Sequence, residues 1–166
     1  QVFMAVPLAA EIDERLAQLG RDLRDDDLEP LTRAIYERAK AAAGTDVVRA
    51  HQELERAART IGPFFEQYDL LVTATISRTV PPLGLLDTTD VAAMARHGGA
   101  FSALTVPFNI TGQPAISLPI GKDRSGLPVG VQFVAAFGRE DLLLRIASQI
   151  EATGAWDPRP VWPPVG

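Results

Sequence analysis

The chain contains no cysteine, few lysines and few histidines. The absence of cysteine excludes disulfides, thiolate nucleophiles and zinc sites with thiolate ligands, and it permits a reducing compartment. The lysines are Lys40 and Lys122, and the histidines are His51 and His97. No apolar run approaches the roughly 20 residues that a membrane-spanning helix requires. We therefore expect a cytoplasmic protein that does not interact with membranes.

The charge balance argues against a nucleic-acid partner. The 166 residues include 21 acidic and 16 basic side chains, which gives a net charge of −5 at pH 7. Nothing in that balance favours binding to nucleic acid or to an anionic membrane. A hydrophobic content of 46% and a charged content of 22% are typical of a globular protein, and the length suits a single domain.

Neither the acidic residues nor the histidines predict a metal site. Asp25–Asp27 open a predicted helix, where carboxylates compensate the helix dipole. His51 lies beside polar residues on an amphipathic helix, so we expect it to face solvent, and His97 is expected near a helix end. Neither histidine has a carboxylate at ligand spacing. The glycine spacing also lacks a phosphate-loop pattern, and we expect no metal and no cofactor.

Apolar residues at three- and four-residue spacing predict several helices, and glycine or proline punctuates them. Gly20 follows the first helix, Pro30 lies in the first turn of the second, and Thr45 or Asp46 caps the third. Gly62-Pro63 should kink or end the third helix. The expected helices cover residues 8–19, 28–43, 45–61, 90–95 and 139–152.

Three short segments have the composition of β-strands. Residues 69–75 should form a buried strand, and residues 115–120 and 129–134 should pair across a short polar turn. Helices that alternate with a few strands indicate an α/β fold. We expect a single domain over residues 1–166, mainly helical over 1–68, with strands and a last helix over 69–152. The remainder, 153–166, should be an extended tail.

The segment from Phe108 to Val134 carries more glycine and proline than a hairpin needs. Its text closely resembles the C-terminal portion of the amidase signature family, N-x-T-G-x-P-A-x-S-x-P-x-G followed by G-L-P-x-G-x-Q. The matching residues are Asn109, Thr111, Gly112, Pro114, Ala115, Ser117, Pro119, Gly121, Gly126, Leu127, Pro128, Gly130 and Gln132.

The resemblance extends over most of the chain. Asp27–Ala42, Phe64–Gly84 and Gly138–Glu151 with Trp156 are similar to bacterial amidases and to 6-aminohexanoate-cyclic-dimer-hydrolase-like members of the family. One departure is Thr73-Ala74-Thr75, where the family usually has Thr-Pro-Thr. The resemblance implies part of an α/β/α sandwich with a mixed sheet, of which this piece supplies a few strands and about five helices.

The resemblance implies amide hydrolysis by a Ser–Ser–Lys set that lies upstream, in a Gly/Ser-rich signature that this chain lacks. None of the serines here neighbours another serine, follows a glycine or sits in a G-x-S-x-G turn. We therefore assign no catalytic residue. The chain, which does not begin with methionine, is expected to be the C-terminal fragment of an amidase and inactive alone.

Three residues are candidates for substrate contact. In family members related to amidotransferase A subunits, an acidic residue seven positions before the motif asparagine holds the substrate amino group, and Ser102 matches that position. A serine there favours a plain amidase, although Ser102 equally suits a helix cap or turn. Phe101 and Phe108 could line an apolar acyl pocket, and both also suit the core.

Two functions remain open at this stage. The chain could form the C-terminal region of an amidase that acts on a small-molecule amide. Alternatively, it could be a non-catalytic binding module of the same fold. Such a module would expose a sheet edge and apolar faces, and it should self-associate as a homo-oligomer to cover them.

Overall fold

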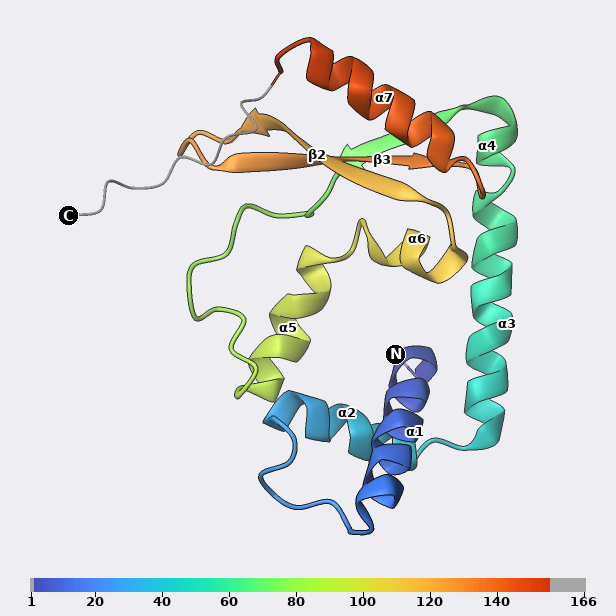
Figure 1. Ribbon diagram of the computed structural model, residues 1–166, viewed down its shortest axis with the longest axis vertical. Coiled ribbons are helices and arrows are strands. Elements are labelled where there is room, and N and C mark those ends of the chain that lie inside the picture. The colour runs from blue at the N-terminus through green and yellow to red at the C-terminus, as the bar shows by residue number, and fades with distance from the viewer. Residues whose placement is uncertain (1, 156–166) are drawn as a thin grey trace, which may run out of the picture. The chain divides into compact units, whose positions relative to one another are not determined.

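The computed structural model describes residues 2–155, which form seven helices and three strands (Figure 1). The α/β class expected from the sequence is confirmed. Most of the expected tail, 156–166 with Trp156, lies outside the described residues. The described chain divides into two compact units, one of residues 2–59 with Pro81–Phe101, the other of Thr60–Val80 with residues 102–155.

The first unit is helical. It contains α1 (Val2–Leu19), α2 (Pro30–Lys40), most of α3 (Gly44–Ile61) and α5 (Val91–Phe101). Helices α1 and α2 lie side by side and bury Ala5, Ala9 and Ala39 between them. These small side chains let the two helices approach closely. Val6, Ile35 and Tyr36 pack around the three alanines and complete this core.

Asp13 joins α1 to α2 through both of its carboxylate oxygens. Tyr36 Oη donates to Oδ1 over 2.7 Å, and Lys40 Nζ donates to Oδ2 over 2.6 Å. The hydrogen bond from Lys40, followed by that from Tyr36, holds the pKa of the Asp13 carboxyl below its usual range. Lys40 lies on an exposed helix face, as the sequence predicts, and is ion-paired there.

Asp27 organises the loop between α1 and α2. Arg21 makes a two-pronged ion pair with its carboxylate, at 2.6 and 2.8 Å, and the backbone N–H of Arg24 donates to Oδ2. These donors hold the pKa of Asp27 far below its usual range, with the Arg21 hydrogen bond as the largest cause. The acidic run therefore orders a loop, and α2 begins after it at Pro30.

Several helix boundaries agree with the sequence, and others do not. Gly20 adopts a positive φ of 62° directly after α1, and Asp90 Oδ1 accepts a hydrogen bond from the Ala93 N–H at the start of α5. The expected start of α1 at residue 8 is wrong, since the helix begins at Val2 and contains Pro7. The expected end at residue 95 is also wrong, because α5 runs through Gly98 and Gly99 to Phe101.

The second unit contains a three-stranded antiparallel sheet in the order β1-β3-β2. The strands are β1 (Leu70–Ala74), β2 (Ala115–Lys122) and β3 (Pro128–Ala135), and β2 and β3 form the expected hairpin. Its register pairs Thr73, Gln132 and Ser117 across the three strands. Because side chains alternate along a strand, these three share one face of the sheet.

The opposite face of the sheet is covered by α7 (Glu140–Ala152). The buried residues of this core are Leu118, Phe133, Ala135 and Leu143. The expectation that 69–75 forms a buried strand is wrong, because β1 is an edge strand and Val72 is 52% exposed. The short helices α4 (Phe64–Gln67) and α6 (Val106–Thr111) complete this unit.

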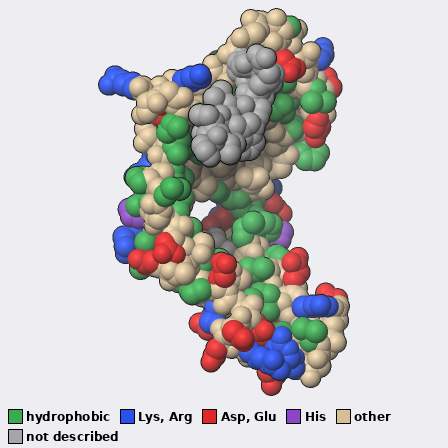
Figure 2. All heavy atoms as spheres, turned by 60° about the vertical axis from the view of Figure 1, so that its left-hand side comes forward, with side chains coloured by type: hydrophobic (Ala, Val, Ile, Leu, Met, Phe, Trp, Pro, Cys, Tyr) green, Lys and Arg blue, Asp and Glu red, His purple; other side chains and the backbone are tan. Residues whose placement is uncertain are grey.

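The surface mixes charged and apolar side chains. Figure 2 shows acidic and basic groups interspersed over one face, with apolar groups between them. Many large apolar side chains are exposed, and those of Met4, Leu83, Phe137 and Leu144 are the most accessible. Within the described residues, no helix is both long and apolar enough to cross a bilayer.

Candidate functional site

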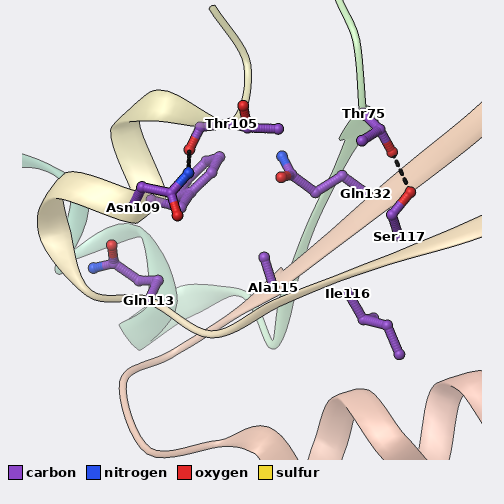
Figure 3. A pocket seen from close by; sticks show the side chains of 9 residues that line it. Thr75, Thr105, Asn109, Gln113, Ala115, Ile116, Ser117 and Gln132 are labelled. Carbon is purple, nitrogen blue, oxygen red and sulfur yellow. Dashed lines mark hydrogen bonds between the residues drawn. The ribbon is translucent and has the colours of Figure 1, made fainter. Parts of the chain in front are cut away.

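A hollow of about 280 Å³ opens in the second unit, between α6 and the face of the sheet that α7 does not cover. Strand residues and helix residues line it together, as Figure 3 shows. None of the lining side chains is charged. They are Thr75, Thr105, Phe108, Asn109, Gln113, Ala115, Ile116, Ser117 and Gln132.

Two hydroxyl groups meet at one side of the hollow. Thr75 Oγ1 and Ser117 Oγ lie 2.5 Å apart, and the two residues come from segments at opposite edges of the sheet (Figure 3). Gly130 of the central strand lets them meet. A Cβ at that position would lie 2.8 Å from Thr75 Oγ1 and 2.9 Å from Ser117 Oγ. Only glycine leaves that space.

Gln132 is the one polar residue that is fully buried among the described residues, with 4% of its surface exposed. Its Nε2 donates to Thr73 Oγ1 and to the backbone carbonyl of Leu104, each over 3.0 Å. The first bond joins two strands, and the second ties the sheet to the segment that leads into α6. Both bonds fix the position of the amide at the hollow.

Helix α6 places the remaining polar side chains. Asn109 Nδ2 donates to the backbone carbonyl of Thr105, and the Thr111 hydroxyl donates to Gln113 Oε1. Gly112 ends the helix with a φ of 81°, a left-handed conformation that brings the chain round into β2. The motif N-x-T-G-x-P-A therefore forms the end of α6, a turn and the start of β2 beside the hollow.

The structure places the three predicted contact residues differently. Phe108 is buried and lines the hollow. Ser102 lies in a turn after α5, where its carbonyl accepts hydrogen bonds from the Thr105 and Val106 N–H groups. Phe101 is the last residue of α5. Neither Ser102 nor Phe101 is among the described residues that line the hollow, and their role in substrate contact stays a prediction.

Sequence reasoning did not find the Thr73, Thr75, Ser117 and Gln132 cluster. The signal was present, because a hairpin over 115–120 and 129–134 allows Ser117 to face Gln132 on one side of the sheet. The histidines form no such cluster. His51 is exposed and its ring meets that of Phe3 edge-on, with centroids 5.1 Å apart. Within the described part of the chain, no three His, Asp or Glu side chains gather as metal ligands.

Comparison with known proteins identifies the family of this chain. The family model described as Amidase matches residues 3–144. The chain belongs to the amidase family. The family resemblance seen in the motifs of the sequence is thereby confirmed.

Curated amidases resemble the chain along most of its length. The 6-aminohexanoate-cyclic-dimer hydrolase of Pseudomonas sp. (strain NK87) is 40% identical over 161 residues, which cover 91% of this chain and 32% of that protein. The enzyme of the same name from Paenarthrobacter ureafaciens is 39% identical over 159 residues. The chain therefore spans about a third of the length of these relatives.

A solved structure agrees with this assignment. The structure of 6-aminohexanoate cyclic dimer hydrolase superposes on this chain with a TM-score of 0.81 at 38% identity. The match covers 92% of this amidase-family chain and 33% of the solved chain. The fold of this chain is thus that of the matching third of the solved chain.

Proposed function

We propose that this chain is the C-terminal region of an amidase signature hydrolase that cleaves carboxylic amide C–N bonds. The observation that carries the proposal is the match over about nine tenths of the chain to an amide hydrolase three times as long. Its substrate is a small-molecule amide. The chain works in the cytoplasm and binds neither nucleic acid nor membrane.

In the proposed reaction, a serine outside this chain attacks the carbonyl carbon of the amide. The C–N bond breaks, the amine leaves with a proton, and water then hydrolyses the acyl-serine ester to release the carboxylic acid. A second serine relays the proton, and a lysine is the final base; both also lie outside this chain. The serines and lysines present here have no such grouping in sequence.

The role of this chain is to complete the sheet and to form one wall of the acyl pocket. Phe108, which lines the hollow, contributes an apolar contact there. We propose the same apolar contact for Phe101. We also propose that Ser102 contacts the substrate and, being uncharged, supplies no counter-charge for a substrate amino group. By itself the chain is catalytically silent.

A serine-directed acylating probe tests this proposal on the product of the native gene. Peptide mapping should locate the probe on a serine outside these 166 residues, in a product near three times this length. A probe on one of the five serines here would contradict the proposal, as would hydrolysis of a simple aryl amide by the purified chain. The serines concerned are Ser77, Ser102, Ser117, Ser125 and Ser148.

A second candidate function rests on the exposed apolar side chains. Leu83 is fully exposed, Phe137 is 80% exposed, and Val72 is half-exposed on an edge strand. A non-catalytic module of this fold would cover such surfaces by self-association. Sedimentation analysis and a thermal melt test this second candidate. A stable homo-oligomer favours the non-catalytic module, and a monomer with a two-state melt favours a domain that folds by itself.

A further inference from the structure

The side-chain amide of Gln132 is held with a defined polarity. Its Nε2 donates to two oxygen acceptors, Thr73 Oγ1 and the Leu104 carbonyl, and the reverse orientation would set Oε1 against that carbonyl oxygen. Gln132 lines the hollow, and Oε1, which takes part in neither of these two bonds, is the acceptor that its side chain offers there.

Asn109 has the same polarity as Gln132. Its Nδ2 donates to the Thr105 carbonyl, which leaves Oδ1 as an acceptor for a second group. Gln132 extends from the sheet toward the helix that carries Asn109 (Figure 3). The hollow therefore has one fixed acceptor on the sheet and one on α6.

The hydroxyl pair supplies the complementary donor. One of the Thr75 and Ser117 hydroxyls donates to the other, so a single hydroxyl hydrogen remains for a further acceptor. Ser117 pairs directly with Gln132 on the neighbouring strand and shares its face. A ligand at this place thus meets an acceptor and a donor on adjacent strands, a few ångströms apart (about 5 Å between paired Cβ atoms).

The lining excludes a charged ligand. Neither an acidic nor a basic side chain lines the hollow, so an ion would lose hydration without gaining a counter-charge. Phe108 and Ala115 add an apolar wall suited to a short alkyl group. A neutral group that carries both an N–H donor and a C=O acceptor matches these surroundings.

We infer that the hollow between α6 and the sheet is a subsite for a neutral carboxamide group. The N–H of the ligand donates to Gln132 Oε1 or Asn109 Oδ1, and its carbonyl accepts from the Thr75–Ser117 hydroxyl pair. The biological meaning of the subsite rests on the proposed function, because it would hold an amide of the substrate beside the reacting one.

Titration of the full chain with propionamide tests the subsite by NMR. The side-chain NH₂ signals of Gln132 and Asn109 should shift and saturate at millimolar propionamide. Propionate and propylammonium, which have similar size and carry a charge, should produce no saturable shift at these signals. Equal responses to all three probes, or no response to propionamide, would overturn the inference.

Variants at exposed positions give a second readout that does not depend on the buried glutamine. Ser117→Ala and Asn109→Leu should each weaken propionamide binding about tenfold, the loss of one hydrogen bond. Ser125→Ala, in the turn between β2 and β3, is the matched control and should bind as the original chain does. Wild-type binding by both folded hollow variants would refute the assignment.

The failure of this inference can be told from the failure of the proposed function. Binding of propionamide requires no nucleophile and is measured on the chain alone. A chain that binds propionamide, while the native product carries no reactive serine outside it, keeps the subsite and loses the amidase proposal. A native product with a reactive serine outside this chain, together with no propionamide binding, keeps the amidase proposal and loses the subsite.

Discussion

The hydroxyl oxygens of Thr75 and Ser117 lie 2.5 Å apart, and both border the space that a side chain on Gly130 would fill. The sheet therefore brings two polar groups 42 residues apart into one hydrogen bond. That contact depends on the missing Cβ of the strand between them.

Gly130→Ala should destabilise the chain. The new methyl group would lie under 3 Å from both hydroxyl oxygens, so one hydroxyl must rotate away and the hydrogen bond breaks. We expect a loss of about 1–3 kcal/mol in the free energy of unfolding, as for other overpacked sites. Gly121→Ala is the control, because its methyl would meet only Val129 Cβ at 3.8 Å. Equal denaturation midpoints for the two variants would contradict this account.

Leu143→Ala should remove much of the contact between α7 and the sheet. Leu143 is 4% exposed and belongs to the main core, so the substitution should cost about 2–5 kcal/mol of unfolding free energy. The adjacent Leu144 is 66% exposed, and Leu144→Ala should change the free energy by less than about 0.5 kcal/mol. Urea denaturation of both variants gives the comparison. Similar losses would show that α7 packs by another face.

The stability of the α1–α2 pair should depend on acid through Asp13. Its hydrogen bonds with Lys40 and Tyr36 lower its pKa in the folded state from the ordinary value of 3.8. A group with a depressed folded pKa stabilises above the unfolded pKa, and that contribution is lost as the pH falls through the folded pKa. Thermal melts should therefore show a decline in stability below about pH 4, where ordinary aspartates titrate.

The variant Asp13→Asn isolates this effect. It should be less stable than the original chain at neutral pH, and the two should converge toward acid pH because the original then loses the same ion pair. Glu14→Gln removes a neighbouring carboxylate that forms no ion pair among the described residues, and its melts should follow the original chain. A constant difference between Asp13→Asn and the original at every pH would contradict the role of the carboxylate.

Local patterns in the sequence predicted most of the elements and failed where tertiary contacts override local preference. The apolar spacing placed the start of the first helix at residue 8, yet the helix begins at Val2, and Ala5 and Ala9 on either side of Pro7 bury against α2. Gly98 and Gly99 signalled a helix end, but α5 continues through them, and a Cβ on Gly98 would press on Met94 at 3.2 Å.

The hollow was the least predictable part. Its residues come from the position after β1, from α6 and its flanks, and from both strands of the hairpin. Only the register of the sheet aligns Ser117 with Gln132 and Thr73. The motif predicted turns at Gly112 and Pro114, and it did not predict that helix α6 forms before them. The family, in contrast, was readable from the sequence because its motif residues are contiguous.

The central claim is that this chain completes an amidase. The most direct measurement is amide hydrolysis by a hybrid in which these 166 residues replace the matching third of the Pseudomonas 6-aminohexanoate-cyclic-dimer hydrolase. The account predicts that the folded hybrid hydrolyses an amide through the upstream serine while the chain alone does not. A folded hybrid that hydrolyses no amide, or a chain that does so unaided, would contradict it.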